Sequence, residues 1–148
     1  MSNPLKKYGV NRDLEQKGSE VTVDDMTFIV RSASASNRGY RFALAIAANR
    51  RREELQADSA KAFDIHESVM IEAFSDAVIL GWRGVDGEDG QPLEFNRENC
   101  IKIMESCPEI WDAVHEAAID TSRFRSYAQE DGEALGKSLS GTSSTEPT

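Results

Sequence analysis

The residues best suited to chemistry are two histidines and two cysteines, and their spacing argues against a metal site. His66-Glu67 and His115-Glu116 each begin like a zinc-binding helix motif, but neither has a second histidine four residues after the first. Six residues separate Cys100 from Cys107, which on one helix places the two thiols roughly 10 Å apart, beyond the reach of a disulfide. We therefore expect no metal and read both cysteines as small buried side chains in a reducing compartment.

An acidic, glycine-rich loop follows Trp82, and its spacing fits neither of two known ligand-binding loops. Aligning Gly90 with the invariant glycine of a calcium loop puts Val85 at the first ligand position and Asn96 at the last, so both ends fail. No Gly-Lys-Ser/Thr follows the glycines, as a phosphate loop requires. The sequence instead predicts a hairpin-like turn with Asp89-Gly90 at its tip. No cofactor or catalytic residue is expected, and the chain is predicted not to be an enzyme.

Four aromatic residues are the candidates for binding a partner: Phe28, Trp82, Phe95 and Trp111. Large aromatic side chains are enriched among the residues that dominate protein–protein binding energy. The two tryptophans admit two interpretations: either both anchor the core and join the two halves of the chain, or one lines a groove for a partner. Substitution by alanine separates them, because removing a buried tryptophan costs about 3–5 kcal/mol of stability. Removing a groove tryptophan instead abolishes binding and leaves the protein folded.

Charge is distributed unevenly along the chain. Its 148 residues carry a net charge of −9, yet residues 1–55 sum to +3 and residues 56–148 to −12. The acidic part is repelled by phosphate backbones and by anionic lipids, so neither nucleic acid nor a membrane is an expected partner. Basic segments of other proteins are favoured instead. No apolar run approaches membrane-spanning length, and the N-terminus lacks the apolar core of a secretory signal, so a cytosolic protein is expected.

Composition and pattern predict a mainly α (α+β) fold, a single helical domain with a small N-terminal β-hairpin. Residues 1–19 are polar and are expected to form a flexible arm. Residues 20–32 place β-branched residues on both sides of Asp24-Asp25, which predicts the hairpin. A lone hairpin is only marginally stable, so its edges offer a route to self-association. The domain is expected to span residues 20–130, and the Gly- and Ser-rich residues 131–148 to form a disordered tail.

A first long helix is predicted over residues 40–56. Asn37 is well placed to cap its N-terminus. Tyr40 begins an apolar stripe at helical spacing, and Phe42 with Ile46 widens that stripe. We therefore expect this helix to bury a broad face.

Three further helix boundaries follow from local signals. A second helix is expected over residues 58–80, ended by Gly81 in a left-handed conformation. Asn96 is a good cap for a helix over residues 97–106. Pro108 must end that helix and suits the first position of the next one.

Several short motifs occur in a characteristic order: Tyr8-Gly9-Val10, Thr27-Phe28-Ile29-Val30-Arg31, Asn37-Arg38-Gly39-Tyr40, Gly81-Trp82-Arg83-Gly84-Val85-Asp86, Asp89 through Phe95, Asn96-Arg97-Glu98-Asn99 and Pro108-Glu109-Ile110-Trp111. With them the chain resembles the tail assembly chaperones of long-tailed bacteriophages and prophages. The resemblance implies a mostly helical protein of the host cytoplasm that is absent from the mature virion. It also implies that the chain binds the tape measure protein, keeps it soluble and helps recruit the tail-tube protein. Self-association into a homo-oligomer along that client fits the same expectation.

A second function is compatible with the same residues. The chain is alternatively a structural virion protein, such as a head-tail joining or tail-terminating subunit, whose hairpin mediates ring formation. Mass spectrometry of purified particles separates the two hypotheses, because a chaperone is absent from the finished virion.

Overall fold

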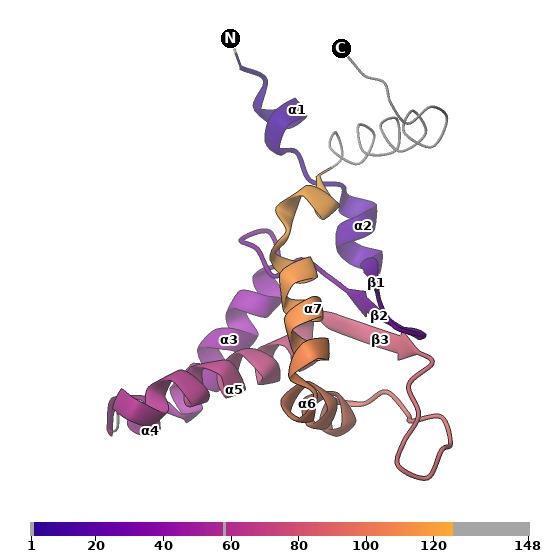
Figure 1. Ribbon diagram of the computed structural model, residues 1–148. Helices are drawn as coiled ribbons and strands as arrows, with labels where there is room; N and C mark the ends of the chain where they lie inside the picture. Colours follow the sequence, from indigo (N-terminus) through magenta and orange to yellow (C-terminus); the bar gives the residue numbers. More distant parts are fainter. Residues whose placement is uncertain (1, 58, 126–148) are drawn as a thin grey trace, which may run out of the picture.

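The fold is mainly helical with one small antiparallel sheet, as predicted. The computed structural model describes residues 2–57 and 59–125 (Figure 1). Its strands are β1 (Ser19–Val23), β2 (Met26–Val30) and β3 (Ile79–Arg83). Its helices are α1 (Pro4–Tyr8), α2 (Arg12–Lys17), α3 (Arg38–Arg50), α4 (Arg52–Ala57), α5 (Ser59–Ala77), α6 (Arg97–Ser106), α7 (Pro108–Ile119) and the 3-10 turn η1 (Thr121–Phe124).

The predicted N-terminal hairpin forms one side of a three-stranded sheet. The strand order is β1-β2-β3, and both pairings are antiparallel. Asp24 lies at the hairpin turn with a φ of 54°. Val21, Phe28 and Val30 are buried, while Glu20 and Thr22, which flank Val21 on β1, are exposed. The alternation shows that the sheet has one face in the core and one toward solvent.

The prediction that a helix continues to Leu80 and ends at a left-handed Gly81 is wrong. Helix α5 ends at Ala77, and Gly81 lies within β3, paired with Ile29 of β2. The apolar run before Trp82 fits helical spacing, so periodicity alone does not separate strand from helix there. Residues 79–83 form a strand because they pair with β2, which is remote in sequence.

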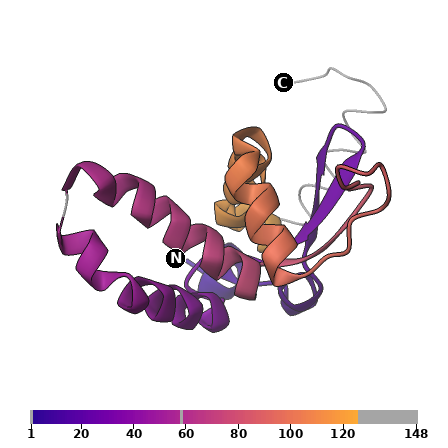
Figure 2. The ribbon, with the colours of Figure 1, turned by 90° about the horizontal axis from the view of Figure 1, so that it is seen from below.

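Helices α3, α4 and α5 form a helical hairpin that extends away from the sheet (Figure 2). The side chain of Asn37 accepts a hydrogen bond from the backbone N–H of Tyr40, which confirms the predicted cap. Three buried residues, Ala47, Ile65 and Val69, form a small separate core within this hairpin. The hairpin is therefore partly stabilised by its own contacts.

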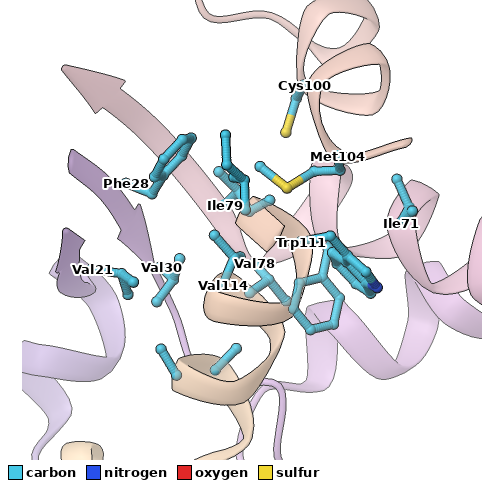
Figure 3. Packing of buried hydrophobic residues seen from close by; sticks show 14 of the residues in the cluster. Val21, Phe28, Val30, Ile71, Val78, Ile79, Cys100, Met104, Trp111 and Val114 are labelled. Atoms are coloured by element: carbon cyan, nitrogen blue, oxygen red, sulfur yellow. The ribbon is translucent and has the colours of Figure 1, made fainter. Parts of the chain in front are cut away.

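One predicted cap and one predicted helix start on the C-terminal side are confirmed. The Asn96 side chain accepts from the backbone N–H of Asn99 at the start of α6, and Pro108 occupies the first turn of α7. Helix α7 then packs on the inner face of the sheet, and its Val114 belongs to the same main core as Val30 of β2 (Figure 3). The sheet is thus covered on one face by a helix that comes much later in the chain.

A network of ion pairs connects α3, α5 and α6. The carboxylate of Glu72 lies 3.6 Å from Arg50, 3.8 Å from Arg51 and 3.4 Å from Arg97. Arg97 also meets Asp76 at 2.6 Å. The side chain of Glu72 is only 18% exposed, so these pairs are screened less by solvent than ordinary surface pairs.

The N-terminal arm contains the short helices α1 and α2 and contacts the rest of the chain. The Arg31 guanidinium donates a hydrogen bond to the carbonyl oxygen of Glu15 at 2.7 Å. The backbone N–H of Asn11 donates to the carbonyl oxygen of Phe124, also at 2.7 Å. The predicted tail, residues 131–148, lies outside the described residues.

Candidate interaction site

The four aromatic candidates fall into two separate groups. Phe28, Trp82 and Phe95 form a continuous row of aromatic contacts. Trp111 instead packs on Phe74 of α5, with ring centroids 4.8 Å apart. The structure therefore brings three of the candidates together and places the fourth in the main core.

Trp82 is the centre of the row. Its ring meets Phe28 edge-on at 6.1 Å and Phe95 edge-on at 5.0 Å. Its indole Nε1 donates a hydrogen bond to the carbonyl oxygen of Leu93 at 2.9 Å. Edge-to-face pairs of this kind add stabilisation beyond their buried area, so Trp82 fixes the returning end of the loop against the sheet.

The sheet register explains why Phe28 and Trp82 meet. They are direct partners in the β2–β3 pairing, so both side chains point to the same face. Gly84, which follows β3, has a φ of +75°, and a Cβ atom there would lie 2.6 Å from the carbonyl oxygen of Asp25. Only glycine fits this conformation and this space without strain. The close approach of β3's end to the hairpin turn thus depends on one residue.

The loop after β3 is the predicted hairpin-like turn. The backbone N–H of Leu93 donates to the carbonyl oxygen of Val85, and that of Gly87 donates to Gln91, both at 2.8 Å. Gly90 adopts a φ of +77° at the tip. The loop therefore returns Phe95 to the position where it contacts Trp82.

Burial separates the four candidates by what each can contact. Phe28 is 0% exposed and Trp111 is 4% exposed. Their side chains are inaccessible in the folded chain and act as core anchors. Trp82 and Phe95 are partly exposed, so among the four candidates these two are accessible to another molecule.

The charge around Trp82 and Phe95 is negative. The loop that joins Trp82 to Phe95 carries Asp86, Glu88, Asp89 and Glu94, all exposed. No Lys or Arg lies between residues 84 and 96. Arg83, at the end of β3, is paired with Glu20 at 3.0 Å. A half-exposed aromatic pair beside an acidic loop suits a partner segment that combines apolar and basic side chains.

The two thiols are free and differ in burial. Cys100 is fully buried in α6, and Cys107, between α6 and α7, is half-buried. Burial raises the pKa of the Cys100 thiol to about 11. A thiol with so high a pKa is a poor nucleophile and metal ligand at neutral pH.

The sequence reading missed the outward direction of the aromatic residues on the helical hairpin. Phe42 and Ile46, expected to widen a buried stripe, are exposed, Phe42 by 69%. Phe63, near the start of α5, is 76% exposed. The signal was present for α3, because Phe42 and Ile46 lie on the side of the helix opposite Tyr40 and Ala47.

Comparison with known proteins places the chain in a family without assigning its activity. Neither curated proteins nor solved structures give a significant match. In the part of the chain that the structure describes, no helix combines the length and apolar character needed to span a membrane. Residues 35–137, well over half of the chain, match the family model described as YdaY prophage protein. The chain therefore belongs to the YdaY prophage protein family.

Proposed function

We propose that this prophage protein is a tail assembly chaperone. In this role it binds the tape measure protein in the host cytoplasm, keeps it soluble and helps recruit tail-tube subunits, and it is absent from the mature virion. Two observations support the proposal: membership of a prophage family, and the order of motifs that resembles tail assembly chaperones.

The half-exposed Trp82–Phe95 pair beside its acidic loop is the observation that carries the proposal. A long helical client presents rows of apolar side chains and, between them, lysine and arginine. The aromatic pair supplies apolar contact area at low entropic cost, and the carboxylates of Asp86 and Glu88 complement basic side chains. We therefore assign client binding to this site.

Co-expression with the tape measure protein of the same prophage tests the proposal. We expect a stable complex in a pull-down and a larger soluble fraction of the tape measure protein. Changing Asp86→Lys and Glu88→Lys together reverses the charge of the loop and is expected to weaken the complex at least about tenfold. The matched control is Glu109→Lys with Asp112→Lys, which changes the net charge equally on the exposed side of α7.

Two results would count against the proposal. One is the absence of any complex with the tape measure protein when both are co-expressed. The other is detection of the chain in purified particles by mass spectrometry, which instead identifies a structural virion protein. Equal loss of binding in the loop variant and in the α7 control would place the client contact away from the Trp82–Phe95 pair.

A further inference from the structure

The outer side of α3 carries an exposed face that is both basic and apolar. We call it the α3 face, and it consists of two neighbouring rows at four-residue spacing: Arg38, Phe42 and Ile46, and Arg41, Ala45 and Asn49. All six side chains are exposed. Because the buried stripe of α3 lies on its opposite side, the α3 face contributes nothing to the core and is available for another molecule.

The charge around this face is opposite to that of the whole chain. Residues 26–52 contain six arginines and no Asp or Glu, in a chain with a net charge of −9. Among the residues that the structure describes, neither Arg38 nor Arg41 takes part in an ion pair. The α3 face therefore favours an acidic surface. Phe42 and Ile46 favour a protein partner over a phosphate backbone, because apolar side chains gain most when they are buried against other apolar groups.

A surface of matching character lies between β1 and α7. It is a groove of about 490 Å³, which we call the α7 groove, lined by Val21, Ala113, Glu116, Ala117, Ile119, Asp120 and Arg123. Residues 103–122, which include α7, contain five acidic residues and no Lys or Arg. Arg123 lies 3.8 Å from Asp120 and donates to Ser19 of β1, so this cation is already engaged. The groove offers an apolar floor and carboxylates at its side.

The two surfaces of one molecule cannot meet each other. Helix α5 lies between α3 and α7, with α3 packed on one of its sides (Figure 2). Complementary surfaces held apart on a rigid body can pair only between different molecules. Such a contact is heterologous, and it repeats into a ring or an open chain of copies.

We propose that the α3 face of one copy docks into the α7 groove of a second copy. Phe42 enters the apolar floor formed by Ala117 and its neighbours, and the guanidinium groups of Arg38 and Arg41 meet the carboxylate of Glu116 and share that of Asp120 with Arg123. Charge complementarity and the exposed Phe42 support this contact, which does not depend on the tape measure protein as client.

Sedimentation velocity of the full chain tests the contact over a concentration series from about 1 µM to about 1 mM, the range expected for a small interface. The wild-type chain is expected to form species larger than a monomer as the concentration rises. Phe42→Asp, which blocks the α3 face, and Glu116→Lys with Ile119→Asp, which blocks the α7 groove, are each expected to weaken association at least about tenfold. Phe63→Asp is the matched control, because Phe63 is an equally exposed phenylalanine outside both surfaces.

A mixture of the two blocked variants gives the sharpest result. The Phe42→Asp chain keeps its groove and the other variant keeps its α3 face, so the mixture is expected to form pairs and nothing larger. All substituted side chains are exposed, and circular dichroism checks that each variant is folded. A wild-type chain that stays monomeric throughout, a Phe42→Asp chain that associates like the wild type, or a mixture that does not pair would each overturn the proposal.

Discussion

At the scale of single residues, burial separates pairs that have the same chemistry. Cys100 is enclosed in the main core, whereas Cys107 is half-buried where α6 gives way to α7. Trp111 is enclosed, whereas Trp82 reaches the surface. In each pair the residue inside the core has a structural role, and the other residue retains access to solvent.

Cys100 is expected to resist alkylation in the folded chain. With its pKa at about 11, the thiolate fraction at pH 8 is on the order of one in a thousand, and the core also excludes the reagent. Mass spectrometry after treatment with iodoacetamide at pH 8 should show no more than one adduct on the native chain and two after unfolding in urea. An adduct on Cys100 without unfolding would contradict the burial.

Trp111 and Trp82 are expected to respond differently to substitution. Trp111→Ala leaves a large cavity beside Phe74 and should lower the free energy of unfolding by about 3–5 kcal/mol. Trp82→Phe keeps an aromatic ring but loses the hydrogen bond to Leu93, at a cost of roughly 0.5–1.5 kcal/mol. Urea denaturation measures both, and a cost below about 1 kcal/mol for Trp111→Ala would refute its role as an anchor.

At the scale of secondary-structure elements, the two asparagine caps differ in what else they hold. The Asn37 side chain accepts from the N–H of Tyr40 and also donates to the carbonyl oxygens of Ser32 at 2.8 Å and Ala77 at 3.1 Å. It therefore joins the start of α3 to the end of α5. Asn96 is exposed and accepts from Asn99 alone in its capping role.

Substitution of the two caps should reveal this difference. Asn37→Ala removes the cap and also leaves the buried carbonyl oxygen of Ser32 and the partly buried one of Ala77 without this donor, and should cost about 2–4 kcal/mol of stability. Asn96→Ala should cost about 1 kcal/mol, the ordinary value of an exposed cap. Thermal and urea unfolding of both variants provide the comparison, and equal costs would show that the Ser32 and Ala77 contacts add nothing.

Two glycines of the loop also form a matched pair. Gly84 and Gly90 have nearly the same positive φ, +75° and +77°, but a Cβ at Gly84 meets the carbonyl oxygen of Asp25 whereas one at Gly90 meets nothing within 4 Å. Gly90→Ala should cost about 1–2 kcal/mol, from the backbone conformation alone. Gly84→Ala should cost more, about 2–4 kcal/mol, because the end of β3 must also move. If urea denaturation gives similar losses in the free energy of unfolding for both variants, the hairpin turn moves away from the added Cβ atom at little cost.

Local signals predicted the elements whose boundaries depend on neighbouring residues. The caps at Asn37 and Asn96 and the start of α7 at Pro108 are decided within one turn of helix, so the sequence alone suffices. Strand β3 was missed because its identity depends on pairing with β2, about fifty residues earlier. The outward direction of Phe42 follows from the helical period, whereas its apolar character alone predicts burial.

At the scale of the whole molecule, Glu72 is the point where three helices are joined. It meets arginines from α3, from the residue that follows α3, and from α6. Sequence reasoning gave no indication of this network, because the residues come from three distant segments. The same holds for the Phe28–Trp82–Phe95 row: each residue was predicted as a candidate, but their contact depends on the sheet register.

Removal of Glu72 is expected to destabilise the chain more than removal of an ordinary surface acid. Glu72→Ala removes a carboxylate that is only 18% exposed and that three arginines share, although Arg97 keeps its pair with Asp76, and should cost about 1–2 kcal/mol. Glu54→Ala, which removes the exposed pair with Arg51, should cost less than about 0.5 kcal/mol. Urea denaturation at low and high salt compares the two variants. Equal losses in the free energy of unfolding would show that Glu72 contributes no more than an ordinary surface acid.

The covering of the sheet by α7 has a consequence for how the chain is made. The ribosome synthesises the hairpin of β1 and β2 before helices α3 to α6, and α7, the helix that buries Phe28 and Val30, emerges only after them. During translation the nascent hairpin therefore presents an apolar face without its cover, the condition in which chains aggregate or recruit host folding factors. A chain terminated before Pro108 lacks α7, and we expect it to be degraded by proteases because the sheet keeps an exposed apolar face.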